Sequence, residues 1–129
     1  RADLTIATDA PDADVVVTLV HVSDDGAYQL ASGIRRLRYR RGRDRAVPVP
    51  DGPVHVAVDM WDTHHRVPAG DRLGLEVASS DAPRFDPQPG TRRPWEATAD
   101  DVRPAEQALF HEGDRESTLT VTRRASGAH

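Results

Sequence analysis

The sequence contains no cysteine, lysine or asparagine, and only 5% of its 129 residues are aromatic. Without cysteine the chain can form neither a disulfide bond nor a thiolate nucleophile, and its redox compartment stays open. Since lysine is absent, all 17 basic residues are arginine, which we interpret as the codon bias of a GC-rich genome. The compartment is therefore not assigned, although the cytoplasm is favoured.

Long hydrophobic runs are also missing. No segment approaches the roughly 18 apolar residues that a membrane-spanning helix needs, and no signal-peptide pattern occurs, so we expect no membrane association. A chain of 129 residues fits a single domain with one core. Ten prolines and nine glycines suit many short strands joined by turns.

Two segments alternate strictly between apolar and polar residues. Residues 54–60 place three valines and Met60 on one face, and residues 72–79 place Leu73, Leu75 and Val77 on one face. A Pro/Gly turn over residues 66–70 lies between them. This pattern predicts two half-buried strands of an antiparallel sheet.

The remaining strands are shorter, apart from one apolar run over 15–22 that predicts a central strand buried on both faces. A hairpin turn is predicted at Asp24-Asp25-Gly26 because Asp and Gly tolerate positive φ. Further strands are predicted over residues 4–7, 28–30, 34–40, 105–111 and 118–122. No window shows a convincing 3.6-residue period. The predicted fold class is therefore all-β, an antiparallel β-sandwich with little or no helix.

Several motifs occur in a fixed order along almost the whole chain. They are Asp12-Ala13-Asp14, Asp25-Gly26, residues 33–40 (GIRRLRYR), Met60-Trp61-Asp62-Thr63, Ala69-Gly70-Asp71-Arg72, Arg84-Phe85-Asp86, and His111 followed by Ser117-Thr118-Leu119. From about Asp12 to Val121, this order resembles the C-terminal non-catalytic domain of the X-Pro dipeptidyl-peptidase and cocaine esterase (CocE/NonD) family of serine hydrolases. Two positions depart from the family pattern. Asp71 stands where the family usually has His, and residues 88–91 keep only the outline of an Asn-Pro-Asn-Thr-Gly turn.

The resemblance implies a jelly roll similar to galactose-binding domains, with one domain over residues 1–122. Residues 123–129 are predicted to be a flexible tail, because chain ends are often poorly ordered. It also implies an upstream α/β-hydrolase domain as the partner, a parent that cleaves esters, amides or X-Pro peptides, and a first strand upstream of Arg1. Without that strand and that partner, the backbone N–H and C=O groups of an edge strand and part of the apolar surface would be exposed to solvent. We therefore expect a homo-oligomer.

No catalytic residue is predicted in this chain by itself. A hydrolase of this family needs a Gly-x-Ser-x-Gly elbow that holds a strained serine between a strand and a helix. No serine here has that setting, because Ser32-Gly33 and Ser126-Gly127 lack the upstream glycine and Ser79-Ser80 ends a strand. We therefore predict no catalytic residue and no cofactor-binding residue.

The long irregular segment 81–104, which holds five prolines, is the strongest candidate for function because long loops in compact domains are usually functional or packed on a partner. Arginine and aromatic residues are enriched at the centres of interfaces. The candidate residues for a domain interface are Trp61, Arg84, Phe85, Asp86 and Trp95. The alternative is that Phe85 plugs one end of the sandwich while Arg84 pairs with Asp81 or Asp86.

His64-His65 suggests a metal site, since Asp59, Asp62 and Asp71 are near in sequence. Adjacent residues of a strand point to opposite faces, so neighbouring histidines seldom bind one ion together. We predict a surface bend and no metal ligand. The single strand histidines, His21, His55 and His111, are likewise expected to be hydrogen-bonded or exposed.

Seven arginines in residues 35–45 suggest nucleic-acid binding, but the chain carries a net charge of −4 and phosphate binding usually needs a positive domain. On a strand, Arg36, Arg38 and Arg40 would share one face. We predict that this row lies over the sheet or pairs with acids of a neighbouring domain, with no nucleic acid as partner. A carbohydrate-binding or oligomerisation module remains the alternative function.

Overall fold

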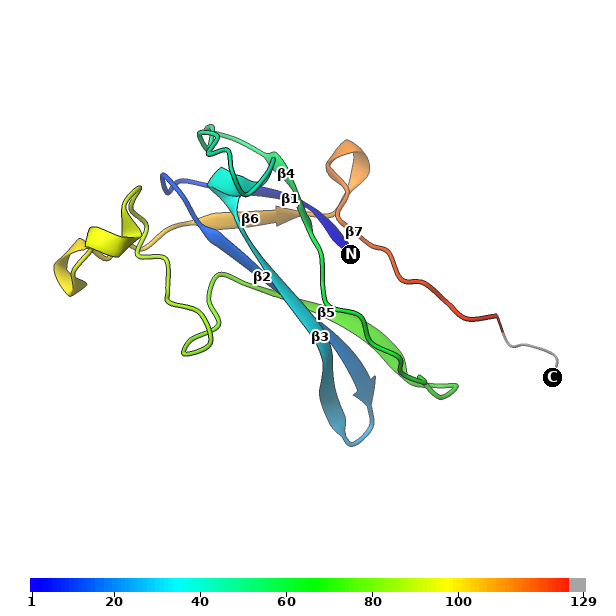
Figure 1. The fold of residues 1–129 in the computed structure, drawn as a ribbon. Helices are drawn as coiled ribbons and strands as arrows, with labels where there is room; N and C mark the ends of the chain where they lie inside the picture. Colours follow the sequence, from blue (N-terminus) through cyan, green and yellow to red (C-terminus); the bar gives the residue numbers. More distant parts are fainter. Residues whose placement is uncertain (126–129) are drawn as a thin grey trace.

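The computed structural model describes residues 1–125 as strands joined by turns, loops and 3-10 helices of three residues each (Figure 1). The strands are β1 (Ala2–Thr8), β2 (Asp14–Ser23), β3 (Gly26–Arg36), β4 (Val54–Val58), β5 (Arg72–Ala78), β6 (Gln107–Phe110) and β7 (Thr118–Leu119). The 3-10 helices are η1 (Leu37–Tyr39), η2 (Pro94–Glu96), η3 (Ala99–Asp101) and η4 (Gly113–Arg115). None of the described helices has the length and apolar character needed to cross a membrane. The predicted all-β class is confirmed.

The first sheet is built around β1, whose period of two is visible in its burial. Ala2, Leu4, Ile6 and Thr8 are buried and the residues between them are half-buried. On one side β1 pairs antiparallel with β4, and on the other it pairs with β6 and β7 at successive positions. Strand β1 is therefore central, and its apolar face closes one side of the core.

The second sheet has the order β3-β2-β5, with both pairs antiparallel. Val15, Val16 and Val17 are all buried, so the predicted central strand with two covered faces is confirmed. The predicted hairpin between Ser23 and Gly26 is also present, and Gly26 adopts a φ of +140°. Strand β3 carries a bulge opposite Leu19/Val20 and runs without a break through the predicted strand 28–30 and the first residues of the predicted strand 34–40.

The two sheets pack face to face around a core of aliphatic side chains from β1, β2 and β4, closed by Leu37 of η1. Leu4, Leu37, Val17, Val56 and Val58 are at most 1% exposed. Half-buried apolar residues of the neighbouring segments extend this core: Val49, Val54, Met60, Leu75 and Val77. The interior is therefore filled by aliphatic side chains.

Two sequence predictions about these strands are wrong. Both predicted segments contain a strand, β4 within 54–60 and β5 within 72–79, but β4 pairs with β1 and β5 pairs with β2, so they belong to different sheets. The predicted strand 34–40 ends at Arg36, and Leu37–Tyr39 forms η1. Leu37 is wholly buried there as part of the core, so η1 turns this apolar side chain inward at the end of β3, which hydrophobic burial favours.

The predicted tail 123–129 is only partly described. Residues 123–125 have no regular secondary structure, and residues 126–129 lie outside the described part of the chain.

Candidate docking surface

The segment that leaves β4 crosses β3 at very close range. A Cβ atom on Gly33 would stand 2.0 Å from the carbonyl oxygen of Asp59, so only glycine allows the two backbones to approach this far. Directly after this crossing, Trp61 Nε1 donates a hydrogen bond to the carbonyl of Leu30 at 3.4 Å. Trp61 is nevertheless 51% exposed, so its ring lies on the surface while its edge is fixed to β3.

The segment that follows β5 returns to the opposite edge of the same sheet. Arg84 Nη2 donates to Ser32 Oγ at 2.6 Å, and Ser32 belongs to β3 whereas β5 is the other edge strand. Residues 79–84 must therefore cross one face of the sheet. The Oγ of Ser32, a buried residue, gives Arg84 a fixed partner at the end of this path.

Arg84 joins two aromatic rings at the surface. Its guanidinium carbon lies 5.2 Å from the centre of the Trp61 ring and 4.8 Å from that of Phe85, within the range of cation–π attraction. Its Nε also pairs with Asp81 at 3.1 Å, and the amide of Phe85 donates to the carbonyl of Asp81. Three of the five predicted interface residues are thus brought together in one preorganised group, the Trp61–Arg84–Phe85 cluster.

The other two predicted residues lie outside this cluster. Asp86 is exposed, and Arg84 pairs with Asp81 instead. Trp95 is 69% exposed in η2, and no ring contact joins it to Trp61 or Phe85 in the described part of the chain. The alternative pairing of Arg84 with Asp81 is present as well, so the same contact stabilises the loop and orients the cluster.

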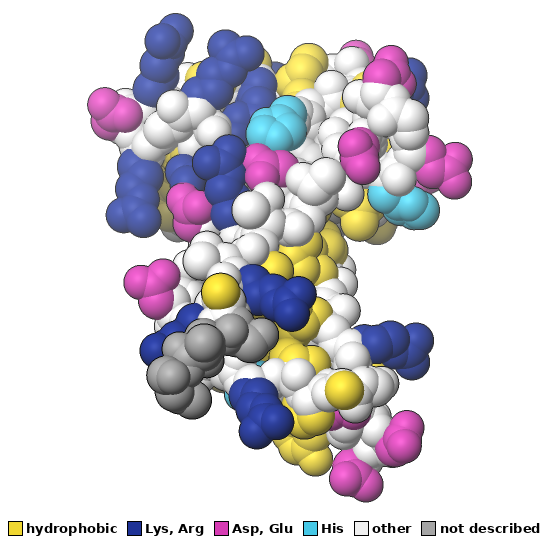
Figure 2. Space-filling view, turned by 90° about the vertical axis from the view of Figure 1, so that its right-hand side faces the viewer, with side chains coloured by type: hydrophobic (Ala, Val, Ile, Leu, Met, Phe, Trp, Pro, Cys, Tyr) yellow, Lys and Arg dark blue, Asp and Glu magenta, His cyan; other side chains and the backbone are white. Residues whose placement is uncertain are grey.

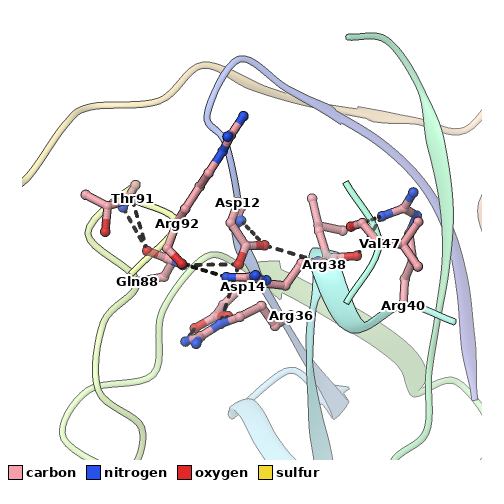
Figure 3. A network of polar contacts seen from close by, with 12 residues as sticks. Asp12, Asp14, Arg36, Arg38, Arg40, Val47, Gln88, Thr91 and Arg92 are labelled. Carbon is pink, nitrogen blue, oxygen red and sulfur yellow. Dashed lines mark hydrogen bonds and ion pairs between the residues drawn. The ribbon is translucent and has the colours of Figure 1, made fainter. Parts of the chain in front are cut away.

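The base of the long loop is held by a buried carboxylate (Figure 3). Asp12 is 1% exposed, and its Oδ1 accepts from the amides of Ala13 at 2.9 Å and Arg38 at 3.1 Å. Its Oδ2 accepts from Gln88 Nε2 at 3.4 Å. Burial is the main cause that raises the pKa of Asp12, opposed by these backbone donors and by the nearby Arg36 and Arg38.

Gln88 connects this carboxylate to the next turn. Its Oε1 accepts from the amides of Gly90 at 3.0 Å and Thr91 at 3.3 Å. Although residues 88–91 depart from the family's asparagine-containing turn, the Gln88 side chain bonds to the amides of this turn. Further along, the side chains of Thr98 and Asp101 form a capping box around η3, and the Thr98 bonds lower the pKa of Asp101.

The expected row of arginines on one strand face is wrong, because Arg38 and Arg40 lie beyond the end of β3. Arg36 forms two bonds to Asp14, at 2.8 and 3.2 Å. Arg38 donates to the carbonyl of Arg92 at 2.6 Å. Arg40 donates to three backbone carbonyls, those of Leu37, Val47 and Pro48.

The guanidinium of Arg36 therefore joins β3 to β2, and those of Arg38 and Arg40 stabilise loop backbone of their own chain. Figure 2 shows that arginine side chains gather at one end of the visible face, with acidic side chains among them. Such mixed charge is a poor footprint for a phosphate backbone.

The histidines show what sequence reasoning missed. His64 is exposed, and His55 lies 3.4 Å from Asp3. His65, in contrast, contacts His21 of β2, 44 positions away in the sequence, and Asp71 contacts the other side of the same ring. In the sequence, the one available signal for this group of side chains was Asp71, which stands where the family pattern usually has His.

Comparisons with known proteins agree with this architecture. Residues 1–120 match the family model of the X-Pro dipeptidyl-peptidase C-terminal non-catalytic domain. A cocaine esterase of Rhodococcus sp. (strain MB1 Bresler) is 36% identical over 87 residues, which are 66% of this chain and 15% of the esterase.

Two solved structures contain a domain with a similar fold. An aminopeptidase from the marine sediment archaeon Thaumarchaeota archaeon gives a TM-score of 0.80 at 27% identity, and an alpha-amino acid ester hydrolase labelled with selenomethionine gives 0.76 at 26%. Each match covers 90% of this chain and 21% of the other. The chain thus spans less than a quarter of each of these proteins.

Proposed function

This chain belongs to the family of X-Pro dipeptidyl-peptidase C-terminal non-catalytic domains, and we propose that its Trp61–Arg84–Phe85 cluster docks on an α/β-hydrolase domain of the same polypeptide. In this position the cluster helps to shape the rim of the hydrolase active site. The proposed parent is a serine hydrolase that cleaves esters, amides or X-Pro peptides. Support for a larger parent comes from the hydrolases that share this domain as a minor part of their length.

One observation carries the proposal: an arginine that is fixed between two aromatic rings at the surface. Tryptophan and arginine are the residue types most enriched among the anchors of protein interfaces. Arg84 is held by Ser32 and Asp81, so little side-chain entropy remains to be lost on docking. A half-exposed tryptophan whose indole N–H is already bonded can bury its ring without leaving an unsatisfied donor.

The test replaces Arg84 and Phe85 by alanine together in the full-length parent. We expect docking to weaken by about 2 kcal/mol or more, as for other interface anchors, seen as earlier thermal unfolding and a changed kcat/KM among substrates. Arg93→Ala is the matched control, because its pair with Glu96 is exposed on both sides and such pairs contribute little. Unaltered activity together with unaltered thermal unfolding in the double variant would refute the docking role.

A second proposal concerns self-association of the isolated domain. Strand β5 pairs only with β2 among the described residues, and its Leu73 is 41% exposed, so an apolar edge strand is open to another copy. We expect the sedimentation coefficient to rise with protein concentration. Leu73→Arg should reduce this rise, while Val121→Arg, at a residue 48% exposed outside the strands, should not. A monomer at every concentration would contradict the proposal.

A further inference from the structure

Three side chains from separate segments form a chain of hydrogen bonds beside β2. His21 lies in β2, His65 in the connector between β4 and β5, and Asp71 directly before β5. The Nδ1 of His21 is 2.8 Å from Nε2 of His65, and its Nε2 is 2.7 Å from Oδ2 of Asp71. The side chain of His21 is only 12% exposed, so both contacts are made by a ring that β2 holds in place.

The contact with Asp71 decides which nitrogen of His21 carries the proton. An ionised carboxylate can only accept, so Nε2 of His21 donates to it. In the neutral ring, Nδ1 then keeps its lone pair, directed at His65. This is the arrangement in which proteins prepare a histidine for a metal ion: the far nitrogen donates to a carboxylate, which fixes the ring and raises the basicity of the near nitrogen.

We propose that Nδ1 of His21 and Nε2 of His65 together bind a divalent transition-metal ion, with Asp71 positioning His21. Metal–imidazole bonds of about 2.0–2.1 Å place two nitrogens about 3.3 Å apart in a tetrahedral Zn²⁺ site and about 2.9 Å apart at neighbouring corners of a square-planar Cu²⁺ site. From the present 2.8 Å, His65 has to withdraw by about half an ångström for Zn²⁺ and hardly at all for Cu²⁺, while both rings turn so that their lone pairs meet at the ion. The connector residues 61–66 are exposed, and they allow this shift. His65 moves its proton from Nε2 to Nδ1, so neutral rings release no net proton on binding.

The number and the chemical type of the ligand atoms indicate which ion binds best. No group of three or more His, Cys, Asp or Glu side chains is arranged to hold an ion in the part of the chain that is described, so the protein supplies two nitrogens and water completes the shell. With two imidazoles and no thiolate, Cu²⁺ binds more tightly than Zn²⁺. The ion would tie the connector that carries Trp61 to β2.

The experiment titrates CuSO₄ or ZnCl₂ into the purified chain past one equivalent and follows binding by calorimetry and, for Zn²⁺, the histidine ring signals by NMR. We expect saturable binding of one ion per chain, loss of binding in His65→Ala and retention in the adjacent His64→Ala. Asp71→Asn should weaken binding roughly 10- to 100-fold, as removal of such an outer carboxylate does elsewhere.

His65 is on an exposed connector, so its replacement should leave the fold intact, as circular dichroism can verify, even if His21→Ala disturbs β2. Binding that persists in His65→Ala, or that disappears in His64→Ala, would overturn the site. So would the absence of saturable binding in the unchanged chain.

Discussion

Gly33→Ala is expected to destabilise the domain by about 3 kcal/mol or more, because it places a methyl group where a backbone already lies. The added Cβ would stand 2.0 Å from the oxygen of Asp59 and 3.0 Å from its carbonyl carbon. If the added methyl group met a flexible side chain, that side chain could rotate away. Here it meets backbone atoms of Asp59, so the whole segment that leaves β4 has to move off β3. The same movement would pull Trp61 away from its bond to Leu30.

Gly74→Ala is the matched control for this substitution. Both glycines lie inside strands of the same sheet, but a Cβ on Gly74 meets only side-chain methyl groups, the Cγ2 of Val20 at 3.0 Å and that of Val22 at 3.6 Å, and side chains can yield. We expect a cost of about 1 kcal/mol for Gly74→Ala. Urea unfolding of the isolated domain measures both values. Equal stabilities of the two variants would show that the crossing of β4 over β3 is not as close as described.

Asp12→Ala is expected to be the second large loss, about 3 kcal/mol. It removes the acceptor of the amides of Ala13 and Arg38, and each buried donor left without a partner costs about 1–3 kcal/mol. It also releases Gln88, so hydrogen exchange should speed up over residues 88–103. Asp9→Ala is the control, since Asp9 also accepts a backbone bond but at an exposed position. A loss no larger than that of Asp9→Ala would contradict the role of Asp12 as an anchor.

Asp12→Asn separates the charge of this side chain from its hydrogen bonds. Burial raises the folded-state pKa of Asp12 above 3.8, so the stability that its protonated form contributes is present below that pH and is lost as pH rises through the folded value. An asparagine does not ionise. The stability of Asp12→Asn relative to the unchanged domain should therefore increase as pH rises through this window, as unfolding at several pH values can measure.

Sequence periodicity predicted which residues are strands far better than which strands pair. The alternation in 54–58 and 72–78 is a local property, and it correctly places Val56 and Val58 in the core and Leu75 and Val77 against it, although Leu73 of the same face is exposed. Pairing depends on partners distant in sequence, so the two strands could not be assigned to separate sheets. The end of β3 was missed for a similar reason, because Leu37 reaches its buried position only when the core around it exists.

For the candidate site residues, too, sequence predicted the local properties but not the contacts between distant segments. Arg84 and Phe85 are neighbours in sequence, and their residue types alone suggested an interface, whereas the contact of Arg84 with Trp61 depends on the path of two loops around β3. Trp95 has the right residue type but lies outside the cluster. The bond between His21 and His65 joins a strand to a distant connector, and no local pattern encodes such a contact.

Hydrogen–deuterium exchange of this domain, alone and within its full-length parent, tests the central claim most directly. If residues 59–61 and 81–86 form the face that docks on a hydrolase domain, their amides should exchange more slowly in the parent, while those of the buried strand β2 should change little. Equal exchange of both segments in the two proteins would mean that this surface faces solvent in the parent, and the docking account would be wrong.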